Sequence, residues 1–153
     1  MPAAAPARPR TSHVVGTEAQ LRALIGDPAE LTCAKISNRL NAMTRRFVEH
    51  SPFVCLATSD RAGHCDLSPR GDPAGFVRIL DERTLLLPER PGNRLADSLR
   101  NLLANPHIGL LFVVPGVTDT FRVNLRTAVA ATQLADSSAL ARVCCDVGHS
   151  PNG

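Results

Sequence analysis

The pattern of hydrophobic and polar positions changes its period once along the chain. In the first third, apolar residues recur every three or four positions over 17–25, 28–36 and 39–49, which predicts three helices. Gly26 and the pair Asp27-Pro28 separate the first two, because glycine ends helices and proline fits their first turn. The N-terminal part is therefore expected to be helical.

Short apolar runs rich in β-forming residues follow, separated by turn residues. They predict six strands, at 52–59, 65–69, 75–80, 83–88, 107–114 and 119–125. One amphipathic helix, 92–105, is inserted before the fifth strand. Because neighbouring strands joined by tight turns pair antiparallel, the predicted fold class is mainly β with some α, a small antiparallel barrel. From about Thr127 the alternation is lost, and no strand is predicted there.

A length of 153 residues fits one domain. We expect a disordered tail over 1–12, a folded domain over 13–126, and an atypical C-terminal segment over 127–153. The tail lacks the apolar core of a secretory signal, and the longest apolar run, Ile108 to Val114, is far shorter than the roughly 20 residues of a membrane span. These features predict a cytoplasmic protein with no membrane partner.

Charge and composition argue against a nucleic-acid partner, a metal site and a disulfide framework. The net charge is +3, but the arginines are scattered and aromatic residues make up only 3%, with no Trp or Tyr, so no nucleic-acid partner is predicted. The five histidines are dispersed, and the cysteines show neither CxxC nor Cys/His ligand spacing, so no metal site and no disulfide framework are predicted. The cysteines are Cys33, Cys55, Cys65, Cys144 and Cys145.

Two short motifs carry groups that suit an anion. In SPRGDP, residues 68–73, a hydroxyl, a guanidinium and a glycine are close together, and arginine offers a planar fork for phosphate. In PERPGNR, residues 88–94, Arg90, Asn93 and Arg94 come just before the predicted helix, whose free N–H groups attract phosphate. Each motif is also typical of a plain turn or a helix cap. No acid–base pair is evident, so catalytic residues stay unknown, as expected where a cofactor carries the chemistry.

From Thr17 to Asn124 the sequence resembles the pyridoxamine 5′-phosphate oxidase-like family of FMN-binding split-barrel flavoproteins, in particular a bacterial branch with the SPRGDP loop. The motifs SPFVCLATSD, SPRGDP, PGNR, NPHIGLLF and FRVN occur in the order of that family. The resemblance implies a split antiparallel β-barrel with N-terminal helices and one inserted helix. It also implies a homodimer that holds FMN in the subunit interface.

The same resemblance implies a set of cofactor-binding positions. The strand end at 67–70 would run beside the flavin ring and ribityl chain with Arg70 near the phosphate, 87–88 would line the same cleft, and Asn93 with Arg94 would hold phosphate oxygens. Together with Arg90 and a threonine near the ring, the expected cofactor-binding residues are Leu67, Ser68, Pro69, Arg70, Leu87, Pro88, Arg90, Asn93, Arg94 and Thr120.

Two departures from the family leave alternatives open. Leu125 stands where the family usually has glycine, and the segment after it matches the hypothesis of a truncated or frameshifted ending. No Trp or Tyr is present to stack on a flavin ring. We therefore expect an FMN-dependent oxidoreductase acting on an unknown small molecule. The alternatives are an F420- or heme-binding protein on the same barrel, and a non-catalytic or defective homodimeric binding protein.

Overall fold

The structure is a computed structural model that describes residues 14–30, 37–90, 95–134 and 137–144. The chain forms two units, Met1–Ile36 and Ser37–Gly153. In the first unit, helix α1 (Glu18–Ile25) begins after Thr17, whose side chain accepts a hydrogen bond from the Gln20 backbone N–H. It ends at Gly26, where φ is +74°, a conformation that favours glycine. The predicted helix over 17–25 is confirmed, whereas most of the one predicted over 28–36 lies outside the described residues.

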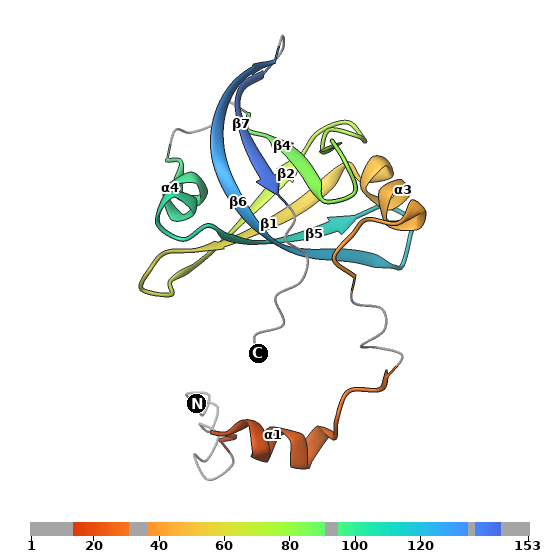
Figure 1. The fold of residues 1–153 in the computed structure, drawn as a ribbon, viewed down its shortest axis with the longest axis vertical. Helices are drawn as coiled ribbons and strands as arrows, with labels where there is room; N and C mark the ends of the chain where they lie inside the picture. Colours follow the sequence, from red (N-terminus) through yellow and green to blue (C-terminus); the bar gives the residue numbers. More distant parts are fainter. Residues whose placement is uncertain (1–13, 31–36, 91–94, 135–136, 145–153) are drawn as a thin grey trace, which may run out of the picture. The chain divides into compact units, whose positions relative to one another are not determined.

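The second unit contains two described helices and one antiparallel sheet of seven strands (Figure 1). The strands lie in the order β2-β1-β5-β6-β7-β4-β3. The elements are α3 (Ala42–His50), β1 (Phe53–Ser59), β2 (Cys65–Gly71), β3 (Arg78–Ile79), β4 (Thr84–Pro88), α4 (Asp97–Ala104), β5 (His107–Val113), β6 (Thr120–Leu134) and β7 (Ser137–Cys144). The predicted fold class, mainly β with antiparallel pairing, is confirmed.

Both predicted hairpins form. β1 pairs with β2 from Phe53 opposite Gly71 to Ser59 opposite Cys65. β3 pairs with β4 over two residues only, which is shorter than the predicted strand 75–80. The difference arises because Gly75 has φ +83° and the Phe76 N–H donates to the Pro73 carbonyl, so the first part of that range forms a turn.

The C-terminal part differs from the sequence prediction. Where no strand was predicted after Thr127, β6 continues to Leu134, and β7 lies between β6 and β4. The segment consists mainly of small and polar residues, which give little hydrophobic alternation. β7 pairs on one side with the strand just before it, from Leu134 opposite Ser137 to Arg126 opposite Cys144, and on the other side with the distant β4, where Thr84 lies opposite Cys144. Pairing of this kind is not visible in a local pattern.

Strand β6 links the two halves of the sheet. Its first half, Thr120 to Arg126, pairs with β5, and its second half, from Arg126 on, pairs with β7. The register shifts between Ala130 and Gln133, and irregularities of this kind increase local bending. β6 is strongly curved in Figure 1, which lets the sheet wrap around its own core.

The core lies on the concave side of the sheet and follows strand alternation. In β6 the inward positions are Phe121, Val123, Leu125 and Thr127, while the residues between them are exposed. Leu125, at the position where the family has glycine, is only 3% exposed and belongs to this core. The core cluster consists of Leu40, Val48, Val54, Leu56, Val77, Leu85, Leu87, Leu102, Ile108, Leu110, Phe112, Val123 and Leu125.

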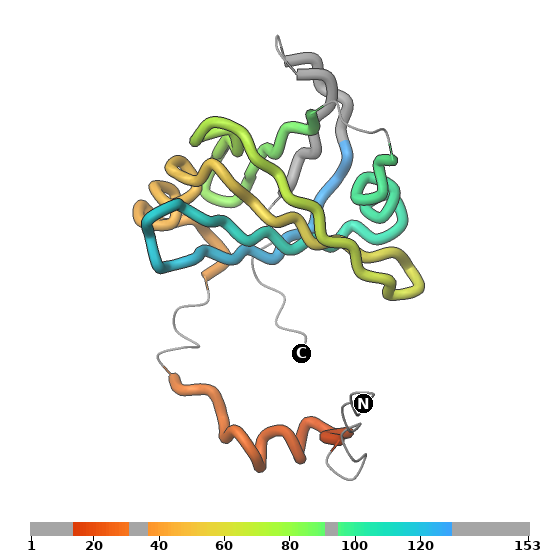
Figure 2. Tube along the Cα trace, turned by 180° about the vertical axis from the view of Figure 1, so that it is seen from behind, coloured from red at the N-terminus to blue at the C-terminus, as the bar shows by residue number. Residues whose placement is uncertain are grey.

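Helix α4 covers one part of the sheet and contacts the tip of the β1–β2 hairpin. The hairpin tip, drawn in olive, extends beside α4 in Figure 2. Leu102 is the apolar residue of α4 that enters the core. Within the described ranges, no helix combines the length and the apolar character needed to cross a lipid bilayer.

Candidate cofactor-binding site

Two ion pairs join the ends of β2 and β4. The Arg70 Nη1 atom lies 2.5 Å from Glu89 Oε1, and the Arg90 Nε atom lies 2.6 Å from Asp72 Oδ2. Four strands separate β2 from β4 in the sheet order, so these contacts join segments from opposite ends of the curved sheet. The two sequence motifs that each carry a candidate anion-binding arginine are thereby brought together.

Arg70 is the most enclosed charge of this group. Its side chain is 19% exposed, that of Glu89 is 24% exposed, and the Arg70 Nε atom is buried without a hydrogen-bond partner. Buried N–H donors nearly always have a partner, so an unmatched one calls for an explanation, for example a bound water or ion. A guanidinium with an unused donor fits an anionic phosphate group.

The motif SPRGDP is a strand rather than a turn over its first four residues. β2 runs through Gly71, and Arg70 lies opposite the buried Val54 of β1. The turn comes later, at 73–76. Pairing with β1 along the whole strand outweighs the turn preference of Pro69 and Gly71, and a proline is tolerated because β2 is an edge strand of the described sheet.

Strand alternation divides the predicted β2 positions between two faces. Ser68 and Arg70 are half-buried on the inner face, whereas Leu67 and Pro69 are exposed on the outer face. Leu67 is 67% exposed. One ligand on the inner face would therefore contact the side chains of Ser68 and Arg70, while Leu67 and Pro69 are available to a group on the outside.

The predicted cofactor-binding residues in and just after β4 also differ in exposure. The Leu87 side chain is 3% exposed and packs in the core, while Pro88 is half-buried at the end of the strand. Arg90 is about half exposed and is paired with Asp72. Of these three residues, Pro88 and Arg90 lie beside the Arg70–Glu89 ion pair in the chain and present surface to a ligand.

Of the remaining predicted positions, the structure describes only Thr120. Asn93 and Arg94 lie outside the described residues. Helix α4 begins at Asp97 and not at 92 as predicted, because Ala96 has φ +55°, a left-handed conformation that interrupts a helix. Thr120 is exposed at the start of β6, where the register Thr120–Val113–Phe53–Gly71 puts it three strand spacings, about 14 Å, from β2.

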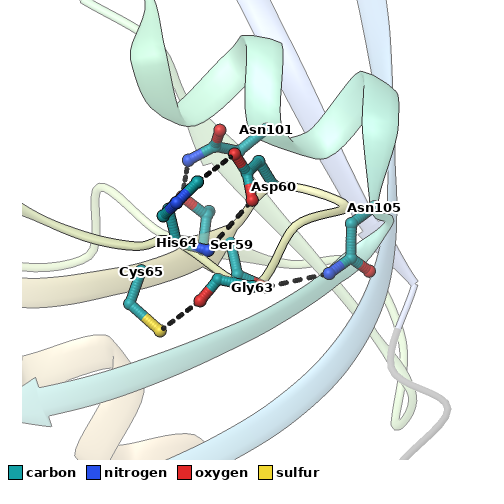
Figure 3. Close-up of polar contacts among 8 residues, drawn as sticks. Ser59, Asp60, Gly63, His64, Cys65, Asn101 and Asn105 are labelled. Carbon is teal, nitrogen blue, oxygen red and sulfur yellow. Dashed lines mark hydrogen bonds and ion pairs between the residues drawn. The ribbon is translucent and has the colours of Figure 1, made fainter.

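A polar network between α4 and the β1–β2 hairpin was not predicted from the sequence. The Ser98 hydroxyl donates to Asp66 Oδ2 (2.9 Å), Asn101 Nδ2 donates to Thr58 (3.1 Å), and Asn105 Nδ2 donates to Ser59 (2.9 Å). Figure 3 shows Asn101 of α4 and Asn105, the residue directly after the helix, facing the hairpin. The spacing of Asn101 and Asn105, one helical turn apart, was the available signal. The network fixes the helix against β1 and β2.

The tip of the hairpin holds an ion pair that shifts both pKa values. His64 Nδ1 lies 2.8 Å from Asp60 Oδ2 (Figure 3). The hydrogen bond and the charge of Asp60 raise the pKa of His64 above its ordinary 6.5, and the hydrogen bonds from His64 lower the pKa of Asp60 below its ordinary 3.8. The His64 contribution to stability is present below pH 6.5 and is lost as pH rises through the raised pKa. The Asp60 contribution is present above pH 3.8 and is lost as pH falls through the lowered pKa.

Replacing Asp60 with asparagine should return the pKa of His64 to about its ordinary value, because the carboxylate that favours the imidazolium is removed. An NMR titration of the His64 ring in both proteins measures the change. Asp97→Asn, which alters an exposed carboxylate on α4, is the control and should leave the titration unchanged. A wild-type pKa at or below 6.5 for His64 would contradict this assignment.

An antiparallel sheet that curls until β2 and β4 meet, with one helix inserted after β4, defines a split-barrel protein. The chain belongs to the family whose model is described as pyridoxamine 5′-phosphate oxidase, which matches residues 40–150. This confirms the family expected from the motifs. The family match also includes the segment after Leu125, as far as residue 150.

Solved structures share this fold. A candidate pyridoxamine 5′-phosphate oxidase from Lactobacillus delbrueckii superposes with a TM-score of 0.57 at 16% identity, covering 71% of this chain and 91% of that chain. HupZ from Group A Streptococcus has a TM-score of 0.54 at 14% identity, with 69% and 88% covered. HutZ from Vibrio cholerae, described as a heme storage protein, has a TM-score of 0.50 at 15% identity, with 72% and 92% covered. No curated protein matches the sequence. At these identities the likeness concerns the fold.

Proposed function

We propose that this protein is an FMN-dependent oxidoreductase acting on a small molecule. The observation that carries the proposal is the enclosed Arg70 guanidinium, whose Nε donor is unpartnered and which shares the inner face of β2 with the Ser68 hydroxyl. A phosphate group would give that donor a charged acceptor, and such hydrogen bonds are stronger than neutral ones. The family match is in keeping with a phosphate-bearing cofactor.

The chain's own residues would anchor and orient the cofactor. Arg70 and Arg90 would hold the phosphate, together with Asn93 and Arg94 as expected from the motif, and Ser68 would donate its hydroxyl. The outer edge of β2 adds backbone groups that no described strand pairs with. The flavin itself would supply hydride or electron transfer, and the protein would supply binding, orientation and shielding from water.

The outer face of the sheet supports a homodimer. Exposed apolar residues gather there on three adjacent strands, with Cys55 of β1 flanked by Pro69 of β2 and Leu111 of β5. Phe53 and Leu67 are on the same face and are 36% and 67% exposed. A second copy covering this face would bring Leu67 and Pro69 into the subunit interface, where the cofactor was expected. The free thiols Cys55 and Cys65 fit a reducing, cytoplasmic location.

The visible absorption spectrum of the purified protein tests the proposal. We expect flavin bands, and release of FMN when the protein is denatured. The same preparation should have about twice the 16.3 kDa chain mass by light scattering. A Soret band would favour a heme protein, and release of a deazaflavin would favour F420. A colourless protein that takes up no added FMN would contradict the enzyme proposal and favour a non-catalytic binding protein.

A further inference from the structure

Among the residues that the structure describes, the charges of the two ion pairs at the proposed phosphate position cancel. Arg70 and Arg90 contribute +2, and Glu89 and Asp72 contribute −2, so the two ion pairs are together neutral. An anionic ligand that approaches this cluster therefore meets two carboxylates as well as two guanidinium groups. The affinity for that ligand therefore depends on whether the two carboxylates stay paired with the arginines.

Arg70 cannot bind a ligand through its free donor in the conformation seen here. The Nε atom is buried, so no ligand atom reaches it while the side chain keeps this position. Glu89 holds the Nη1 atom at 2.5 Å and keeps the guanidinium in place. Satisfying Nε with a phosphate oxygen requires Arg70 to move, and the movement breaks its contact with Glu89.

Glu89 is well placed for such an exchange. It directly follows Pro88, the last residue of β4, and its side chain is 24% exposed, so its carboxylate can turn toward water when it leaves Arg70. The second pair, Arg90–Asp72, joins the same two segments and holds them together while the first pair opens. Arg70 can thus exchange Glu89 for a ligand while β2 and β4 stay together.

We propose that Glu89 is an internal competitor for Arg70, and that a phosphate-bearing ligand binds by displacing the Glu89 carboxylate from the guanidinium. This inference rests on the proposed function for the identity of the ligand. In this scheme the free protein is mostly in the closed arrangement with Arg70 on Glu89. The measured affinity is then the intrinsic affinity reduced by the small fraction of open molecules.

Glu89→Gln tests the exchange, because glutamine keeps the shape of the side chain and removes its charge. If the open form makes up about one tenth of the wild-type protein, the variant should bind FMN up to about tenfold more tightly. Two probes are titrated against wild type and variant: FMN, followed by flavin fluorescence, and inorganic phosphate, followed by the NMR signal of the Arg70 Nε–H group. Both dissociation constants should fall.

The matched control is Glu82→Gln, which removes the carboxylate of an exposed ion pair with Arg39 and should change neither affinity. A second control repeats Glu89→Gln in an Arg70→Ala background. The tighter binding should disappear there, because the guanidinium for which Glu89 and the ligand compete is absent. Thermal melting of each variant establishes that it is folded. If Glu89→Gln unfolds, Glu89→Asp, whose shorter side chain retracts the carboxylate, should give a smaller tightening.

The outcomes separate this inference from the proposed function. Tighter phosphate binding without any FMN binding supports the role of Glu89 and overturns the flavin proposal. Unchanged or weaker binding of both probes in a folded Glu89→Gln protein overturns the role of Glu89, whatever the result for FMN in the wild type. Failure of inorganic phosphate to shift the Arg70 signal in either protein also overturns it.

Discussion

Replacing Phe112 with alanine should lower the free energy of unfolding by about 3–5 kcal/mol, the cost of truncating a large aromatic side chain in a closed core. Phe112 is 0% exposed, and its ring centroid lies 5.9 Å from that of Phe121, which in turn packs on Phe47 at 6.3 Å. Since domains are typically stable by about 5–15 kcal/mol, this one change should remove a large part of the total.

Urea denaturation followed by circular dichroism measures the loss. Leu103→Ala is the control, because that side chain on α4 is 75% exposed and its truncation should cost less than about 0.5 kcal/mol. A loss below about 1.5 kcal/mol for Phe112→Ala would mean that the Phe112 ring is not closely packed in the core.

Replacing Arg70 with alanine should weaken FMN binding by about 1.5–3 kcal/mol, roughly 10- to 150-fold, because a charge-assisted hydrogen bond to phosphate is removed. Arg70→Lys should be intermediate, since lysine keeps the charge but lacks the planar fork. Flavin fluorescence titration gives the dissociation constants.

Arg78→Ala is the control for Arg70→Ala, because it removes an exposed arginine from β3 without touching either ion pair at the site. Melting curves of both variants show whether the fold is retained. If folded Arg70→Ala bound FMN as tightly as wild type, the phosphate would have to be held elsewhere.

The helices and strands that the sequence predicted are those whose own residues carry a clear pattern. β1 and β5 coincide with short apolar runs rich in β-forming residues, which the sequence shows directly. The alternation of side chains along a strand then places Val54, Leu56, Leu110 and Phe112 on one buried face. β7 was missed because its small side chains carry no periodic signal, and because one of its two partners, β4, is far away in the sequence. The extent of β2 was underestimated because Pro69 and Gly71 favour turns in isolation.

The candidate site was also predicted only in part, where a local sequence motif carries the information. Arg70 and Arg90 were singled out from their motifs, and the structure brings those motifs together. Their carboxylate partners, Glu89 and Asp72, were not predicted, because each pair forms only when the curved sheet brings β2 and β4 together. The network of Ser98, Asn101 and Asn105 was missed for the same reason. Charge and hydrogen-bond partners depend on tertiary structure, which spacing alone does not give.

The position of β7 between β6 and β4 also determines when the fold can be completed during synthesis. Thr84 of β4 pairs with Cys144, 60 residues later by subtraction of the two positions. At about 5–20 residues per second, a ribosome needs roughly 3–12 s to make the intervening chain. During that time the edge of β4 that pairs with β7 is open, and open strand edges are prone to association with other chains. β7, the last of the described strands to emerge, is thus the one that covers this edge in the nascent chain.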